Sequence, residues 1–230
     1  MKPRQTAAVN LEPRRLPAVP TNVGLLAALA GPSLFVAVSD RLFGESPRLA
    51  VQIVLQILYC GLVPLVVWIV VRHERLPLRS IGLRRPDLST LVTVVLLWAV
   101  SYALQIVTEP VLDLVGRSGV DEGIQRLVAL PVWFRVVVGA TGGIVEETLY
   151  RGYAVERLGA ITARPWLGGA ISAIVFALAH VPYWGFAFAL VADLPFGIVM
   201  TAFYLWRRDL LANIIVHSGG LVVAMMTLPS

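Results

Sequence analysis

Residues 49–71 constrain the fold more than any other part of the chain, because they contain no Asp, Glu, Lys or Arg. About 20 consecutive apolar residues suffice for a helix that crosses a lipid bilayer. The whole chain shares this bias, since 57% of its 230 residues are hydrophobic and only 14% are charged. Soluble domains carry about 25% charged residues, and disordered chains are poor in large apolar residues. The composition excludes both classes and predicts that lipid surrounds most of the protein.

Seven apolar stretches approach the length of a membrane span, so we predict an all-α fold, a polytopic transmembrane helical bundle of about seven spans. We expect residues 1–21, which are polar and proline-rich, to form a disordered cytoplasmic tail. N-terminal transmembrane helices are predicted over 22–115, and a C-terminal helical core over 116–230. The seven stretches lie at about 22–38, 49–71, 90–107, from Pro131 to the charged residues that begin at Glu146, 165–181, 187–206 and 210–228.

Two local patterns refine this prediction. Gly31 and Pro32 interrupt the first stretch, since proline disfavours the interior of a helix. Residues 121–130 place Ile124, Leu127 and Val128 on one helical face, which predicts an interfacial helix that leads into the fourth span.

The basic residues indicate the orientation. With the N-terminus inside and seven spans, fourteen Lys and Arg residues fall on the inner side and four on the outer side. Cytoplasmic loops of membrane proteins carry such an excess. The net charge of +5 is thereby explained, and we expect no nucleic-acid partner. We predict a multi-pass protein of a cell membrane, the bacterial inner membrane, with a cavity that opens to the cytoplasmic side.

Ionisable residues inside spans are costly and usually functional, and here they gather in the C-terminal half. The fourth segment carries Glu146, Glu147 and Arg151, and the later segments add His180, Asp193, and Asn213 with His217. Glu147 and Arg151 are four residues apart on one helix and are expected to pair. Glu146 is rotated by about 100° from that pair, which leaves it either to reach water at the helix end or to act as a general base.

The hairpin between the fourth and fifth segments brings His180 to the depth of Glu146. Glu146 precedes Thr162 by sixteen residues and His180 follows it by eighteen. At about 1.5 Å per residue, both side chains lie at nearly the same height on adjacent antiparallel helices, where they can share a water molecule. The alternative is a histidine bonded to a neighbouring carbonyl, in a helix that ends at Val181-Pro182.

The motif Glu146-Glu147-x-x-x-Arg151-Gly152, followed by Phe176-x-x-x-His180 and a late His217, resembles the CPBP (Abi) family. That family includes type II CAAX prenyl endopeptidases and bacterial proteins of bacteriocin processing and self-immunity. The resemblance covers about residues 120–228. Within that range it includes the segment Leu194-Pro195-Phe196-Gly197. It implies a glutamic-type intramembrane protease without a cofactor, whose substrate is a membrane-embedded or membrane-tethered protein or peptide.

The resemblance also implies individual roles. Glu146 and His180 would activate a water molecule, Glu147 and Arg151 would brace the site, and His217 would hold the oxyanion. Tyr150 and Phe176 are expected to line the cavity. The sequence departs from the family at Leu221, where many members have Asn or Asp. Asn213, one turn before His217, offers an amide on the same face of the helix.

Three other functions stay open at this point. Two His and two Glu residues are also the ligand types of a catalytic zinc site, although the common HExxH spacing is absent and we predict no metal. A small proton-coupled transporter would use Glu146, His180 and Asp193 as a relay. A non-catalytic peptide-binding scaffold or immunity protein of the same fold is favoured by Leu221. We expect the Asp193 side chain either to make a hydrogen bond in helix packing or to face water at a kink before Pro195.

Overall fold

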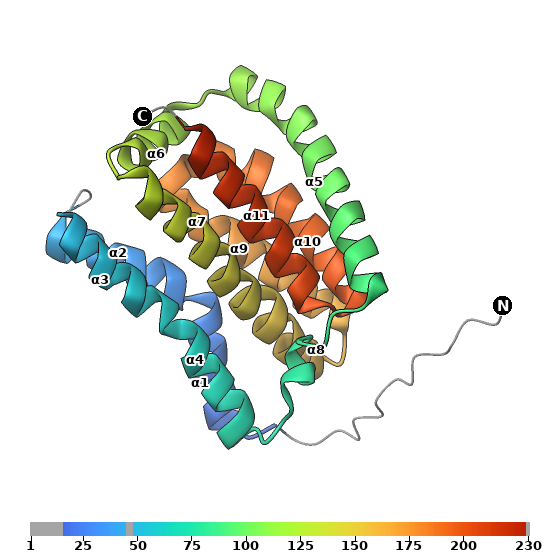
Figure 1. The fold of residues 1–230 in the computed structure, drawn as a ribbon. Helices are drawn as coiled ribbons and strands as arrows, with labels where there is room; N and C mark the ends of the chain where they lie inside the picture. Colours follow the sequence, from blue (N-terminus) through green and yellow to red (C-terminus); the bar gives the residue numbers. More distant parts are fainter. Residues whose placement is uncertain (1–15, 45–47, 229–230) are drawn as a thin grey trace.

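The computed structural model describes residues 16–44 and 48–228, which form helices and short connections without any β-strand (Figure 1). The predicted all-α class is therefore confirmed. Within these residues, four helical stretches are long and apolar enough to cross a membrane, and a bent helix pair raises the number to five. The predicted count of seven spans is not confirmed. The four stretches are Leu49–His73, Leu88–Val115, Pro165–Arg207 and Leu210–Thr227.

The surface of these stretches fits lipid. Only 17% to 33% of the residues in their most apolar windows are buried inside the protein. The exposed side chains include Leu91, Val95 and Ile57, each at least 60% exposed. Continuous apolar surface of this extent is unusual on a soluble monomer, so the protein is a multi-pass membrane protein.

The bent pair consists of α1 (Ala18–Leu29) and α2 (Gly31–Phe43), which meet at 57°. The bend falls at the predicted Gly31-Pro32 interruption, and Pro32 lies in the first turn of α2, where its missing N–H costs nothing. Helix α1 begins inside the segment predicted as a disordered tail. Residues 1–15 of that segment lie outside the described residues.

The next two membrane-length stretches lie on opposite sides of the bundle (Figure 1). The first combines α3 (Leu49–Cys60), α4 (Leu62–Trp68) and the π-helical turn η1 (Ile69–His73). After the 3-10 turn η2 (Leu78–Ile81) comes α5 (Leu88–Val115). A reciprocal capping box starts α5, because the Asp87 side chain accepts from the Thr90 N–H and the Thr90 hydroxyl accepts from the Asp87 N–H.

The C-terminal half supplies the remaining helices. The helix predicted before the fourth segment is present as α6, and the fourth segment contains a long π-helical run, η3. The elements are α6 (Ser118–Val128), α7 (Val132–Glu146), η3 (Glu147–Val155), α8 (Glu156–Thr162), α9 (Pro165–Phe188), η4 (Ala189–Asp193), α10 (Leu194–Arg207) and α11 (Leu210–Thr227).

The sequence suggested that the helix of His180 ends at Val181-Pro182, and this is wrong: α9 continues to Phe188. Pro182 lies inside the helix, and the break comes at Gly185, whose φ of 82° and ψ of 163° are not helical. Glycine adopts such positive φ values without the steric penalty of a Cβ atom. The chain turns there and continues into η4 and α10.

Helices α7 and α11 lie side by side in the centre of the bundle (Figure 1). A Cβ atom on Gly143 would lie 2.6 Å from the backbone nitrogen of Ser218, so only glycine permits this approach. The Ser218 hydroxyl donates to the carbonyl of Ala140 across the same contact, at 3.0 Å. Gly143 thus allows two site-bearing helices to pack closely.

One end of the bundle gathers the segment 74–87, the α8–α9 turn and the α10–α11 turn; we call it the arginine-rich end. Its connections are held by ion pairs, such as Arg84 Nη2 with Asp209 Oδ2 at 2.6 Å. The buried Glu74 accepts hydrogen bonds from the side chains of Thr21, Tyr153 and Arg157. This cluster, which the sequence analysis did not identify, fixes α1 and η1 to the helix that carries the candidate site.

Candidate active site

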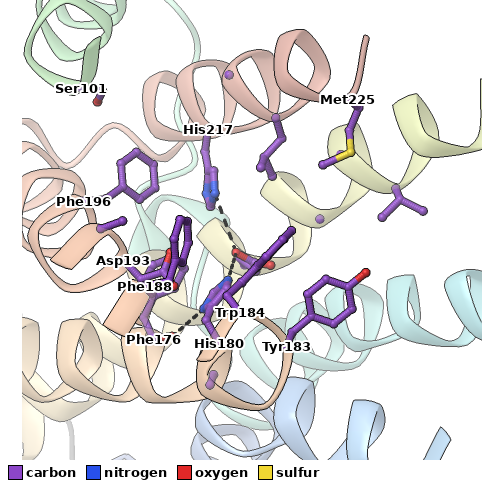
Figure 2. A pocket seen from close by; sticks show the side chains of 18 of the residues that line it. Ser101, Phe176, His180, Tyr183, Trp184, Phe188, Asp193, Phe196, His217 and Met225 are labelled. Atoms are coloured by element: carbon purple, nitrogen blue, oxygen red, sulfur yellow. Dashed lines mark hydrogen bonds and ion pairs between the residues drawn. The ribbon is translucent and has the colours of Figure 1, made fainter. Parts of the chain in front are cut away.

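Glu146 faces two histidines from different helices. Its Oε2 atom lies 3.7 Å from His180 Nε2 and 3.8 Å from His217 Nε2 (Figure 2). Glu146 ends α7, His180 belongs to α9 and His217 to α11. Direct N–H···O hydrogen bonds are 2.7–3.2 Å long, so the separations leave the three groups close enough to be bridged by one small molecule such as water. Glu146 Oε2 is buried and has no hydrogen-bond partner among the described residues.

Both histidines present their Nε2 atoms to Glu146 because their Nδ1 atoms are engaged elsewhere. His180 Nδ1 lies 2.8 Å from the carbonyl oxygen of Phe176. A carbonyl only accepts, so this nitrogen carries the hydrogen. His217 Nδ1 lies 2.8 Å from Glu147 Oε1, a carboxylate oxygen that also accepts. The Nε2 atoms of the neutral rings therefore bear lone pairs.

Glu147 is the buried anchor beneath this site. The predicted pairing with Arg151 is present, with 2.8 Å between Glu147 Oε1 and Arg151 Nη1 and neither side chain exposed. Asn213 Nδ2 lies 3.3 Å from Glu147 Oε2 and also donates to the carbonyl of Met200, at 2.9 Å. The amide hydrogens of Asn213 thus serve the anchor and not the face of Glu146.

Arg151 is fixed as firmly as its partner. Its guanidinium carbon lies 4.2 Å from the centre of the Phe176 ring, and its Nη2 donates to the Gly197 carbonyl at 3.4 Å. Phe176 also packs edge-on against Tyr150, with ring centres 5.3 Å apart. Both aromatic side chains are buried and line the cavity described next. They form its floor beneath the histidines.

The π-helical run η3 begins at Glu147, directly after Glu146. The two adjacent glutamates on either side of this start have different environments. Glu146 lines the cavity, whereas Glu147 is paired with Arg151. Single π-helical turns occur frequently at functional sites. No residue pattern in the sequence indicated this run, because its residues read as an ordinary helix.

A cavity of about 550 Å³ contains the site. Its lining includes Glu146, His180, His217, Leu221 and Asp193. Among the described residues, the lining takes none from 60–97, 151–175 or 197–215, the ranges that include the arginine-rich end. The cavity therefore extends from Glu146 toward the end that holds α6, away from the arginine-rich end.

The lining also includes residues of the N-terminal helices, for which the sequence predicted no part in the site. Tyr59 and Gln56 of α3 and Gln105 of α5 face the cavity. The amide and phenol groups of these residues could have indicated a role in the cavity. Each lies inside an otherwise apolar stretch, where it needs a polar partner or water. Gln56, for example, donates to Thr141 Oγ1 of α7 at 2.7 Å.

Two residues of uncertain role in the sequence lie in the cavity wall. Leu221 stands near the catalytic candidate, because a Cβ atom on Gly142 would lie 3.9 Å from Leu221 Cδ1 and 4.0 Å from Glu146 Oε1. Asp193 is 8% exposed, and its Oδ2 has no hydrogen-bond partner. The interpretation of Asp193 as a packing hydrogen bond is therefore not supported for this oxygen. Among the described residues, no group of three or more His, Cys, Asp or Glu side chains is arranged to hold a metal ion.

The fold and the site define a class, a helical membrane protein with a Glu–His–His cluster in an interior cavity. Residues 128–220 match the family model described as "Type II CAAX prenyl endopeptidase Rce1-like". The resemblance to the CPBP (Abi) family is thereby confirmed over these residues, which hold the whole candidate site except Leu221. The matched residues are thus similar to a family of CAAX-type endopeptidases. Neither a curated protein nor a solved structure matches the chain.

Proposed function

We propose that the protein hydrolyses a peptide bond of a membrane-embedded or membrane-tethered protein or peptide, using a water molecule activated by Glu146 and His180. One observation carries the proposal. The unpartnered Oε2 of Glu146 lies within 3.8 Å of two imidazole Nε2 atoms, inside a cavity of about 550 Å³. The family match of residues 128–220 supports the same reaction class.

Water activation uses the geometry between Glu146 and His180. A water molecule between them donates one hydrogen to the carboxylate and the other to His180 Nε2, which has a lone pair in the neutral ring. As the water oxygen attacks the substrate carbonyl carbon, Glu146 takes one proton as general base. A positioned base of this kind contributes about 10²- to 10⁴-fold to the rate.

His217 is the histidine suited to the developing oxyanion. Its Nδ1–H faces the Glu147 carboxylate at 2.8 Å, and a carboxylate behind an imidazole stabilises the ring when it is protonated. We therefore take His217 as protonated on both nitrogens before the reaction; it donates from Nε2 to the negative oxygen of the tetrahedral intermediate and keeps that proton when the intermediate collapses. Glu147, Arg151 and Asn213 hold the ring in place through the buried contacts already described.

The reaction then closes with a proton transfer. The C–N bond breaks, and protonated Glu146 gives its proton to the leaving amine, which restores the carboxylate. The remaining proton of the attacking water leaves with the carboxylic acid product. No group is consumed, and the balance requires only water and the substrate.

Substrates can be sought in native membranes by sequencing new protein N-termini. Cells would express the wild type, Glu146→Gln or His180→Asn at matched levels, with Glu122→Gln on the exposed face of α6 as the control. We expect termini that appear with the wild type and the control and vanish with both site variants. Termini that persist in Glu146→Gln would overturn the proposal. Loss of cleavage in the wild type after treatment of its membranes with a chelator would assign the reaction to a metalloprotease.

Leu221 favours a second candidate, a non-catalytic peptide-binding scaffold or immunity protein of the same fold. The position that many relatives fill with Asn or Asp holds an apolar side chain close to Glu146. Leu221→Asn distinguishes the two candidates. A wild-type enzyme cleaves without the substitution, whereas a scaffold cleaves only after it. With either function, we place the protein in the bacterial inner membrane, on the basis of the resemblance and the short connections between the helices.

A further inference from the structure

Asp193 is a buried carboxylate that the reaction above does not use. It ends the π-helical turn η4, after the break in α9 at Gly185, and lines the cavity. Asp193 is only 8% exposed, and its Oδ2 has no hydrogen-bond partner within residues 16–44 and 48–228. Buried polar atoms in proteins are nearly always partnered, so an exception calls for an explanation.

The cavity contains no permanent cation to balance Asp193. Among the described residues that line it, none is Lys or Arg. Arg151, the buried guanidinium beneath the floor, is committed to Glu147, to the Gly197 carbonyl and to the Phe176 ring. The third acidic group of the lining, Glu109, is already paired with Arg117 at 2.7 Å. Asp193 and Glu146 therefore line the cavity as carboxyl groups without a Lys or Arg partner in the described lining. The basic side chains of that lining are His180 and His217.

Aromatic side chains line the same part of the cavity as the Asp193 carboxylate. Figure 2 shows Asp193 among Phe188, Phe196 and Phe176, next to His180. Ring faces attract a cation within about 6 Å, and more strongly when water is excluded. An unpaired buried carboxylate is costly, and that cost falls when an opposite charge arrives. Anion and rings together form a recess suited to an alkylammonium or guanidinium group.

We propose that Asp193 forms an anionic subsite, which binds a Lys or Arg side chain of the substrate close to the peptide bond that the water activated by Glu146 attacks. The inference rests on the proposed peptidase function and adds the substrate class: a peptide segment that carries a basic residue within an otherwise apolar sequence. Such a residue is scarce in membrane-embedded segments because its charge is costly there. The subsite therefore selects one position along a hydrophobic substrate.

The test compares cleavage preferences of the wild type and Asp193→Asn. Purified protein in detergent is given a library of apolar peptides with every residue type at each position, and products are identified by mass spectrometry. We expect Lys or Arg to be enriched near the cleaved bond. For a matched pair of peptides with Lys or norleucine at that position, Asp193→Asn should lower kcat/KM at least about tenfold for Lys and leave norleucine nearly unchanged.

Two further variants separate recognition from other effects. Asp193→Lys should shift the preference to Glu, a change that a folding defect does not produce. Asp113→Asn, an exposed acid of α5 that also pairs with Arg117, is the control and should leave both peptides unchanged. Equal loss of Lys and norleucine cleavage in Asp193→Asn would overturn the subsite and make Asp193 a positioning residue for His180. A wild type without basic preference would overturn it too.

A binding experiment keeps the subsite testable if the wild type cleaves nothing. Fluorescent Leu-Ala peptides with one Lys, or with norleucine in its place, are titrated into Glu146→Gln and followed by anisotropy. The subsite predicts tighter binding of the Lys peptide and loss of that difference when Asp193→Asn is added. Equal binding of the two peptides to Glu146→Gln would refute the subsite, whereas absent cleavage alone refutes the peptidase.

Discussion

Gly143→Ala tests whether the close contact of α7 and α11 positions the site. The added Cβ atom would lie 2.5 Å from Ser218 Oγ, 2.6 Å from its nitrogen and 2.8 Å from its Cα. Two of these atoms belong to the backbone, so rotation of a side chain cannot relieve the clash. Non-bonded heavy atoms settle at about 3.5–4.0 Å. The helices must therefore separate by about 1 Å at Ser218 to reach this range.

The displacement reaches the catalytic candidates directly. Ser218 follows His217, whose Nδ1 lies 2.8 Å from Glu147 and whose Nε2 lies 3.8 Å from Glu146. A misplacement of about 1 Å at a reacting centre can lower a rate about 100-fold. Overpacking of a filled interior costs about 1–3 kcal/mol of stability. We expect Gly143→Ala to show both effects.

The assay measures cleavage and thermal unfolding of purified Gly143→Ala in detergent. Gly219→Ala is the matched control, because its Cβ would meet only Trp98, at 3.8 Å, in ordinary contact. Gly219→Ala should resemble the wild type in both measurements. If Gly143→Ala also cleaves at the wild-type rate, the tight contact does not position His217 and the reasoning fails.

Three further predictions concern stability. Glu74→Ala should lower the free energy of unfolding by about 3–5 kcal/mol, because it leaves the buried Arg157 without its partner; equilibrium unfolding that shows no loss would contradict this. Glu147→Ala should cost a similar 3–5 kcal/mol by stranding the buried Arg151, and an unchanged melting temperature would count against the anchor role. A hydrogen bond from the Ser89 hydroxyl and a second from the backbone lower the pKa of Asp87 from 3.8 to about 2. The stabilisation by Asp87 is therefore complete above about pH 4 and lost as the pH falls through 2, so the melting temperatures of the wild type and Asp87→Ala should converge only in that interval.

The sequence predicted the features that depend on composition and short spacing. Residues 49–71 were recognisable as a membrane stretch because length and lack of charge are local properties. The pairing of Glu147 with Arg151 follows from a four-residue interval on one helix. The approach of Glu146 and His180 followed from counting along a hairpin, which works because antiparallel helices rise at the same rate.

Other features depend on tertiary structure and had no local signal. The π-helical run η3 uses ordinary helix-forming residues, so nothing marked it in the sequence. The break at Gly185 lies three residues beyond Pro182, where proline suggested the end of the helix. The absence of a hydrogen-bond partner for Asp193 Oδ2 is a property of all the surrounding helices together. The cytoplasmic opening of the cavity relied on the distribution of charge and stays a prediction, whereas the cavity walls depend on how α2, α3 and α5 pack.

Glu146 is the centre of the account, and the cleavage rate of Glu146→Gln tests it most directly. The Oε2 atom of Glu146 has no hydrogen-bond partner, so its replacement by an amide of the same shape should leave the melting temperature near that of the wild type. We predict that cleavage of a peptide accepted by the wild type falls by about 10²- to 10⁴-fold, the contribution of a general base. A folded Glu146→Gln protein that cleaves at the wild-type rate would contradict it.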